Sequence, residues 1–256
     1  MNAMTTTAAL AAEWLKVRSV RSTWWSLAAV VAVAVAMAAF IGATFRANIE
    51  GVHNFDAVFP GLYGLTVAQL ALVVFAVLTV GSEYTSGSVK ASLAAVPVRG
   101  RFLAAKLAVV GLVAFAVAVP SVLGAFAMAQ WALGPYGTTA GADGVPAALL
   151  GAIAYLPLIA LIAAGVTTMV RHSAIALGVL IPILFLGSQG LASLPGVRTV
   201  LQYLPDQAGM VLMRVTGPPD DGFGPSYGPA TAIVVLLAWT CAAVAGGYLV
   251  LRRRDA

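Results

Sequence analysis

Long stretches of this chain carry almost no charge, and this feature constrains its fold more than any other. Only 9% of its 256 residues are Asp, Glu, Lys or Arg, whereas a typical soluble domain has roughly a quarter. Hydrophobic residues make up 61% of the chain. Because so few charges cannot cover a water-facing surface, lipid must be the solvent for most of the chain. We therefore expect one integral membrane domain comprising residues 1–256.

Six apolar segments are long enough to cross a membrane. A spanning helix needs about 20 mostly apolar residues, because it rises ~1.5 Å per residue through a hydrocarbon core of ~30 Å. The predicted spans are residues 24–45, 62–82, 102–131, 145–170, 173–194 and 229–251. The third is long and contains Pro120, which predicts a tilted, kinked or extended helix. The sequence thus predicts an all-α polytopic membrane protein with six transmembrane helices.

The basic residues are distributed unequally between the two predicted sides of the membrane. Three of the 14 Lys and Arg residues (Arg46, Arg198 and Arg214) fall on one side, and the other 11 fall on the opposite side. Cytoplasmic loops carry the excess of Lys and Arg, so both termini are expected in the cytoplasm. The excess should face membrane lipid rather than nucleic acid, since no patch alternates Lys or Arg with aromatics. The Arg-, Ala- and Val-rich composition is typical of bacteria, which indicates a plasma-membrane location.

Two regions outside the spans also predict structure. Residues 8–23 are expected to form an N-terminal interfacial helix, with Trp14 on an apolar face and Lys16, Arg18 and Arg21 reaching toward water. The alternative is a plain extension of the first span. On the other side of the membrane, residues 197–215 are apolar at helical spacing. We expect two short helices there, at the outer membrane surface, before the last span.

The sequence carries none of the common signatures of covalent chemistry. It has no G-x-x-x-x-G-K-[ST] phosphate loop, so the chain is not expected to bind ATP in that way. His53 and His172 are predicted on opposite sides of the membrane, and Cys241 is the only cysteine, so no metal site is expected. We predict no catalytic residue, no bound cofactor and no enzymatic activity.

Ionisable residues are nearly absent from the predicted spans, and Glu83 is the one candidate, at the cytoplasmic end of the second span. The carboxylates that ion-coupled carriers use inside the membrane are therefore missing. Uncharged polar residues within the spans include Gln69, Gln130, Ser188 and Gln189. They either form interhelical hydrogen bonds or line a transport path.

The loop between the second and third spans is the most informative segment. It runs from Gly81 to Lys106, with Ser86 or Ser88 as a helix cap, Pro97 as a stop and a basic return to the membrane. We expect a short rigid cytoplasmic helix at about residues 86–95. The Glu83 carboxylate should bind the first backbone donors of that helix, or pair with Lys90, Arg99 or Arg101.

This loop resembles the first cytoplasmic loop of ABC-2-type transporter permeases, whose pattern is E-Y/F-x-x-G-[ST]-[ILV]-[RK], a Leu-containing helix and P-x-R-x-R. The matching residues are Glu83, Tyr84, Gly87, Ser88, Val89, Lys90, Leu93, Pro97, Arg99 and Arg101. Residues 13–24 resemble the elbow helix of that family, and residues 203–209 resemble its segment before the last span. Thr85 departs from the family, because many relatives carry a basic residue there.

The resemblance implies a mechanism. Two permeases (a second copy of this chain or a paralogue) pair in the membrane, and two separate ATPase subunits that bind ATP and Mg²⁺ dock on their cytoplasmic loops. The segment from Ser86 to Ala95 would be the coupling helix. The residues implied in coupling are Glu83, Tyr84, Gly87, Ser88, Lys90, Leu93, Arg99 and Arg101. Two other functions stay open: a non-transporting immunity or sensor subunit, and an intramembrane enzyme.

Overall fold

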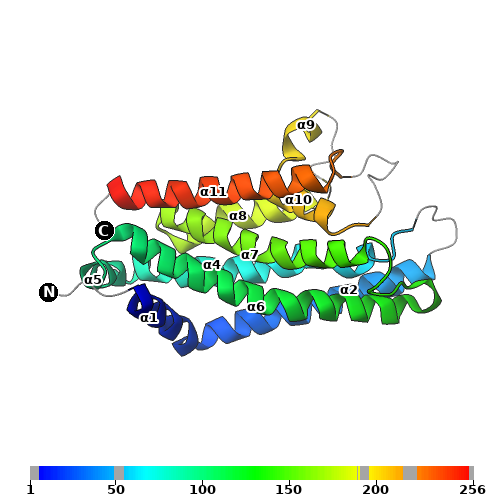
Figure 1. Cartoon of the computed structure of the whole chain (residues 1–256), viewed down its shortest axis with the longest axis horizontal. Coiled ribbons are helices and arrows are strands. Elements are labelled where there is room, and N and C mark those ends of the chain that lie inside the picture. Colours follow the sequence, from blue (N-terminus) through cyan, green and yellow to red (C-terminus); the bar gives the residue numbers. More distant parts are fainter. Residues whose placement is uncertain (1–5, 49–54, 189, 191–195, 216–223, 254–256) are drawn as a thin grey trace.

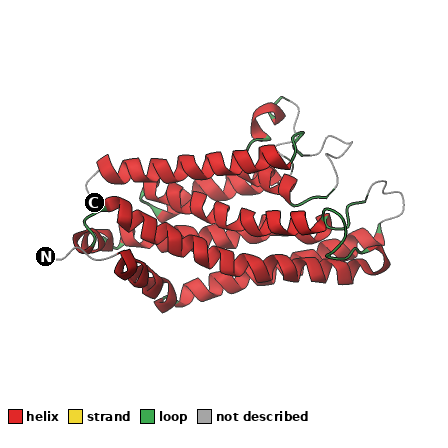
Figure 2. Ribbon diagram, in the orientation of Figure 1, coloured by secondary structure: helices red, strands yellow, loops and turns green. Residues whose placement is uncertain are grey.

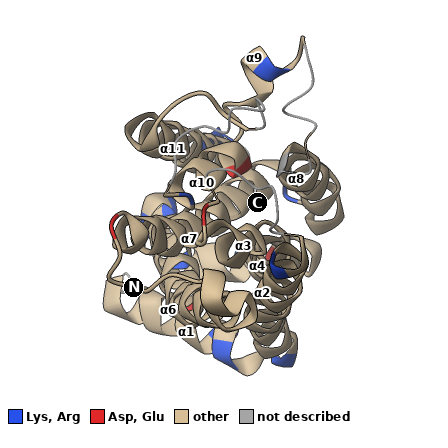
Figure 3. Ribbon diagram, turned by 90° about the vertical axis from the view of Figure 1, so that its right-hand side faces the viewer, with Lys and Arg blue, Asp and Glu red and all other residues tan. Residues whose placement is uncertain are grey.

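The computed structural model describes residues 6–48, 55–188, 190, 196–215 and 224–253. All secondary structure in these residues is helical (Figure 2). Five helical segments are long and apolar enough to cross a membrane: Arg21–Ala47, Phe59–Thr85, Arg99–Tyr136, Val145–Val170 and Pro229–Arg253. They run alongside one another along the long axis of the molecule (Figure 1). In the end-on view, most of the ribbon belongs to uncharged residues (Figure 3). The polytopic, all-α architecture is therefore confirmed.

Four of the six predicted spans lie within longer helices, and a fifth matches its helix. The helices are α2 (Arg21–Ala47), α3 (Phe59–Tyr63) with α4 (Leu65–Thr85), α6 (Arg99–Leu133), α7 (Val145–Val170) and α11 (Pro229–Arg253). The span predicted at 145–170 coincides with α7. The 35 residues of α6 correspond to about 52 Å, which exceeds the ~30 Å hydrocarbon core. The 3₁₀ turn η1 (Gly134–Tyr136) follows it.

The remaining predicted span, at 173–194, corresponds to a shorter helix. Helix α8 (Ser173–Ser188) has 16 residues, and most of the predicted remainder lies outside the described residues. Sixteen residues rise only about 24 Å, so the described structure contains five full-length candidate spans and one shorter apolar helix rather than six. α8 runs antiparallel to α4. A Cβ on Gly81 would lie 2.2 Å from Ser173 Oγ, and Gln69 Nε2 donates a hydrogen bond to the Leu184 carbonyl at 3.3 Å.

Of the two short helices predicted at the outer surface, one is buried. Helix α9 (Arg198–Leu201) has no buried residue, but all eight residues of α10 (Pro205–Leu212) are buried. Small residues on both sides make this close packing possible: a Cβ on Gly209 would lie 2.3 Å from the Tyr155 ring, and a Cβ on Gly151 would lie 2.6 Å from the Leu212 carbonyl oxygen. Two short helices thus precede the last span as predicted, but α10 packs against α7, whereas α9 is not buried.

Two helices outside the spans lie at one end of the bundle, which we call the α5 end. Helix α5 (Ser88–Ala95) joins α4 to α6, and α1 (Thr6–Ser19) crosses obliquely beside it (Figure 1). Val20, between α1 and α2, has extended backbone (φ −94°, ψ 114°). Because this residue interrupts the helical hydrogen-bonding pattern, α1 is a separate helix and not a plain extension of α2. α9 lies at the opposite end (Figure 1).

Small residues bring the long helices together. A Cβ on Gly42 of α2 would lie 3.0 Å from the Ala132 Cβ of α6, and a Cβ on Gly165 of α7 would lie 2.6 Å from the Ala243 backbone of α11. Such contacts drive helix association in a membrane, where lipid tails remove the hydrophobic gain. The outer faces of α2 and α11 stay exposed, and these are the surfaces that lipid or another subunit would cover.

Candidate functional site

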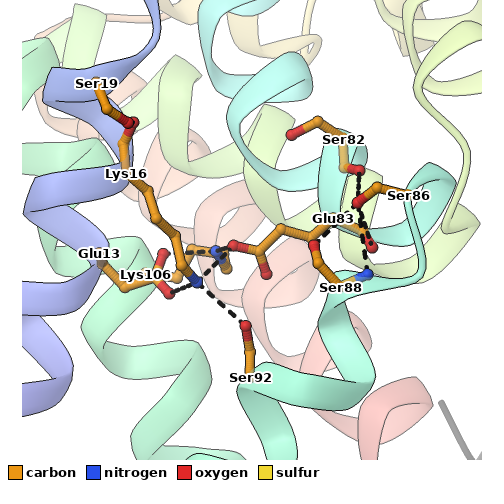
Figure 4. Close-up of polar contacts among 9 residues, drawn as sticks. All are labelled: Glu13, Lys16, Ser19, Ser82, Glu83, Ser86, Ser88, Ser92 and Lys106. Carbon is orange, nitrogen blue, oxygen red and sulfur yellow. Dashed lines mark hydrogen bonds and ion pairs between the residues drawn. The ribbon is translucent and has the colours of Figure 1, made fainter.

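Four charged side chains from three helices meet at the α5 end (Figure 4). Glu13 and Lys16 come from α1, Glu83 from the last turns of α4, and Lys106 from the second turn of α6. Lys106 Nζ lies 2.6 Å from Glu13 Oε2 and 2.7 Å from Glu83 Oε1. Lys16 Nζ lies 2.7 Å from Glu13 Oε1 and 2.8 Å from Glu83 Oε1. Each ammonium therefore bridges both carboxylates. We call these four residues the charge cluster.

The cluster is closed on the α6 side and open on the α1 side. The side chain of Lys106 is 3% exposed, whereas that of Lys16 is 41% exposed. Glu13 and Glu83 are both buried. A buried charge persists only when it is paired, because its desolvation costs several kcal/mol. The two negative and two positive charges balance, so the pairing satisfies this requirement.

Burial and pairing act in opposite directions on the Lys16 ammonium. Partial burial lowers its pKa, but the hydrogen bonds and charges of Glu13 and Glu83 outweigh that effect and hold the pKa above its ordinary value. Lys16 is therefore positively charged throughout the neutral pH range. This keeps both carboxylates bridged under physiological conditions.

The charge cluster also contacts α5. Lys16 Nζ donates to Ser92 Oγ at 3.2 Å. At the start of α5, the Ser88 amide donates to Ser86 Oγ at 3.4 Å, and Gly87 has a left-handed backbone (φ 71°). That conformation strains any residue with a Cβ, so the glycine allows the sharp turn between α4 and α5. Helices α1, α4, α5 and α6 are thus joined at one point.

An apolar cluster lies behind α5. Val89 is 4% exposed, and Leu93 packs partly buried beside it. The other helical residues of this cluster come from four helices, α1, α4, α6 and α11: Ala9, Leu10, Tyr84, Phe102, Leu103, Ala105, Leu107, Tyr248 and Leu251. Gly87, Ser88 and Lys90 are exposed. Helix α5 therefore has one face fixed to the bundle and another accessible to a partner.

Two arginines satisfy the last carbonyls of α11. Arg99 Nη1 donates to the carbonyls of Leu251 at 2.7 Å and Arg252 at 2.8 Å. Arg171 Nη2 donates to the Val250 carbonyl at 3.2 Å, and its guanidinium carbon lies 5.7 Å from the centre of the Tyr84 ring. Because the final carbonyls of a helix have no partner within it, these contacts anchor α11 to the start of α6 and the end of α4.

The expected partners of Glu83 differ from those in the structure. We predicted Lys90, Arg99, Arg101 or backbone donors, but its Oε1 accepts from Lys16 and Lys106. Sequence reasoning missed Lys106 because it counted this residue with the basic loop. The available signal was its position inside the apolar run predicted to start at Phe102, where a charge requires a partner.

The predicted elbow-helix residues divide into two groups. Lys16 belongs to the charge cluster, whereas Trp14, Arg18 and Arg21 are exposed. Their exposed positions on α1 and at the start of α2 are compatible with contact to lipid headgroups. Arg101 is half-buried near the start of α6.

The described residues that were predicted to line a transport path make different contacts. Gln130 donates to the Ala57 carbonyl at 2.9 Å and accepts from the Thr138 amide at 2.7 Å, so it joins loops at the end opposite α5. Ser188 ends α8, and Gln189 lies outside the described residues. The path role of these residues remains a prediction.

Gln69 instead belongs to a second polar cluster, inside the bundle. Its Oε1 accepts a short hydrogen bond from the Tyr155 hydroxyl, and its Nε2 donates to the Thr66 carbonyl at 2.9 Å. Asp206 of α10 is fully buried near Tyr155 and accepts from Gln207 Nε2 at 3.0 Å. We call Gln69, Tyr155, Asp206 and Gln207 the deep cluster. Sequence reasoning missed Asp206 because α10 was expected at the surface.

The described residues contain no group of three or more His, Cys, Asp or Glu side chains that could hold a metal ion. The charge cluster connects α5 to three other helices. The chain segment from α1 through α8, which contains the helices joined by this cluster, also matches a protein family. Residues 9–187 match the family described as "ABC-2 family transporter protein".

The chain belongs to the ABC-2 transporter family. The match covers more than half of the chain, and with the five long apolar helices it makes this protein a multi-pass membrane subunit of an ABC transporter. None of the curated proteins compared with the chain matches it.

Proposed function

We propose that this chain is the transmembrane subunit of an ABC exporter and couples its helices to a separate ATPase subunit. The observation that carries the proposal is the charge cluster, which joins α5 to α1, α4 and α6 through Lys16 and Ser92. The family resemblance of the α4–α6 loop supports α5 as the coupling helix. The ATPase would bind ATP and Mg²⁺, and this chain would bind neither.

The mechanism follows from the two faces of α5. An ATPase subunit would contact its exposed face, which includes Gly87, Ser88 and Lys90. Movement of α5 would pull on Ser92 and on the buried Val89. Both are joined to α1 and α6, so a shift of α5 would change the tilt of these helices. Two permeases and two ATPase subunits would complete the transporter.

We also propose a topology of six crossings, with the α5 end in the cytoplasm of a bacterium. Two features support it: the 11-to-3 distribution of Lys and Arg, and the position of α1, α5 and the C-terminal end of α11 at one end of the bundle (Figure 1). In this topology the short α8 would provide the fifth crossing.

Assembly with an ATPase tests the proposal. The chain is co-expressed with a candidate ATPase that carries a phosphate loop, and the complex is purified through a tag on this chain. We expect ATP hydrolysis by the complex and none by this chain alone. Lys90→Glu, on the exposed face of α5, should weaken co-purification, whereas Arg18→Glu, the matched charge reversal on α1, should not. ATP hydrolysis by the isolated chain would contradict the proposal.

Cysteine labelling tests the topology. Cys241, the exposed free cysteine, is first changed to Ser, and single cysteines are then introduced at Lys90 and at Gly141. A membrane-impermeant thiol reagent applied to whole cells should label the Gly141 position only. Labelling at position 90 from outside would show that the α5 end faces the outside, which would contradict the proposed topology.

A further inference from the structure

A cavity of about 510 Å³ opens directly beside the charge cluster. One wall is the corner between α1 and α2, and the other is formed by α4 and α5. Glu13, Lys16 and Glu83 line it together with the apolar side chains of Phe75 and Leu78. Leu78 is 39% exposed, so the cavity opens at the outer surface of the bundle. It therefore combines a charged end with an apolar flank.

Three of the eight hydroxyl groups that line this cavity donate their protons to backbone carbonyls. Ser26 Oγ donates its proton to the Ser22 carbonyl at 2.9 Å, and Thr79 Oγ1 donates to the Phe75 carbonyl at 2.8 Å. Ser19 Oγ likewise donates to the Lys16 carbonyl at 3.0 Å. With their protons committed to the backbone, these oxygens offer lone pairs to the cavity. This part of the wall thus suits a donor group better than a phosphate.

The carboxylate of Glu83 strengthens this preference. Its Oε1 accepts from both lysines, but its Oε2 is buried without a hydrogen-bond partner among the described residues, and Figure 4 draws no contact to it. Leaving a charged oxygen buried and unsatisfied is costly. A donor that reached Glu83 from the cavity would remove that cost, and an ammonium is the donor best matched to a carboxylate.

We propose that this cavity binds an amphiphile with a protonated amine on an apolar chain, and that its ammonium competes with Lys16 for Glu13 and Glu83. The inference rests on the proposed function for the orientation, which brings the cavity to the cytoplasmic leaflet. Two sources share this chemistry: an ethanolamine phospholipid of that leaflet and a foreign cationic amphiphile. The amine would lie at the carboxylates and the chain along Leu78.

Because the ligand competes with Lys16, its binding would change the contacts between α1 and α5. Lys16 is the more exposed of the two lysines, and its ammonium also donates to Ser92 of α5. An arriving ammonium would displace Lys16 from the carboxylates and so weaken the connection between α1 and α5. Lys106, which is buried on the opposite side, would stay paired. Ligand binding in the cavity would thereby alter the contacts of α5, the helix proposed to contact the ATPase.

Photo-crosslinking to the chain alone tests the site. The purified protein is reconstituted in phosphatidylglycerol vesicles with a diazirine-bearing dodecylamine, or with the corresponding dodecanol as the neutral control. We expect saturable labelling of α1, α2 and α4 by the amine, with affinity about tenfold above that of the alcohol, as a charge-assisted hydrogen bond predicts. Ser26→Phe should fill the cavity and reduce labelling several-fold. Ala28→Phe, exposed on the same helix outside the cavity, should not.

Lys16→Met provides the sharper test, because it separates an amine site from an anion site. If an ammonium competes with Lys16, removing the lysine should tighten amine binding several-fold. Weaker binding by Lys16→Met, equal labelling by the alcohol, or unchanged labelling of Ser26→Phe would each overturn the proposal. Adding phosphatidylethanolamine to the vesicles identifies the source: competition indicates the lipid, and none indicates a foreign amphiphile. No ATPase is present, so failure here is distinct from failure of the coupling proposal.

Discussion

The charge cluster and the deep cluster lie in the same bundle but hold their polar groups in different ways. In the charge cluster, long side chains from three helices form every contact, and the Lys16 side chain is 41% exposed. In the deep cluster, Gln69 binds two backbone carbonyls, and glycine at position 209 brings α10 against the Tyr155 ring. The first arrangement can adjust to a movement of α1 or α5, whereas the second fixes α10 relative to α4 and α7.

This difference assigns separate tasks to the two ends of the bundle. Long side chains can stay paired while their helices shift, so the charge cluster is suited to transmit a displacement. Hydrogen bonds to backbone carbonyls and close packing at glycines are lost when the helices separate. The deep cluster is therefore expected to stay intact while the α5 end moves.

The largest effect on thermal stability should come from Lys106→Met. This change leaves Glu13 Oε2 and Glu83 buried with one cation fewer, and breaking a buried pair costs about 3–5 kcal/mol. We expect a large fall in the midpoint of thermal unfolding in detergent, or loss of the monodisperse protein. Lys90→Met, the same substitution at an exposed position of α5, is the control. Equal midpoints for the two variants would show that the charge cluster is not a buried network.

Tyr155→Phe should have an intermediate effect on thermal stability. It removes the hydroxyl that donates to Gln69 Oε1 and leaves that buried acceptor unsatisfied, at a cost of about 1–3 kcal/mol. The control is Tyr136→Phe, because Tyr136 is 47% exposed. Thermal unfolding of both variants measures the difference. If Tyr155→Phe matched the control, the deep cluster would not fix α10 in the way described.

The smallest effect on stability should come from Lys16→Met. A half-exposed ion pair contributes at most about 1 kcal/mol, so the unfolding midpoint should stay close to that of the wild type. The folded pKa of Lys16 is raised, so its contribution is complete below the ordinary lysine pKa and is lost only as pH rises through the folded value. Stability should thus show no Lys16-dependent change across neutral pH. A loss as large as that of Lys106→Met would remove the proposed asymmetry of the cluster.

The long elements of the fold could be predicted from the sequence, because hydropathy determines them directly. The span at 145–170 coincides with α7, and α5 occupies most of the segment expected between Ser86 and Ala95. Gly87, with its left-handed backbone, precedes α5, and Pro97 follows it. Each limit depends on the backbone properties of a single residue, which the sequence shows directly. These features depend on local composition and not on distant contacts.

The contacts of both clusters could not be predicted, because they join residues far apart in the chain. Glu83 pairs with Lys16, 67 positions away, and no local pattern selects that lysine over Lys90 or Arg99. The burial of α10 depends on the match between Gly209 and Tyr155, which the eight residues of that helix do not reveal by themselves. Tertiary packing decided both outcomes.

Glu83→Gln tests whether Glu83 couples α5 to the spans. Glutamine keeps the shape of the side chain but removes the charge shared by Lys16 and Lys106. Measured at equal expression together with the ATPase partner, membrane insertion and assembly should persist. Transport, or the stimulation of ATP hydrolysis by substrate, should fall several-fold. A Glu83→Gln transporter that works at the wild-type rate would contradict the account.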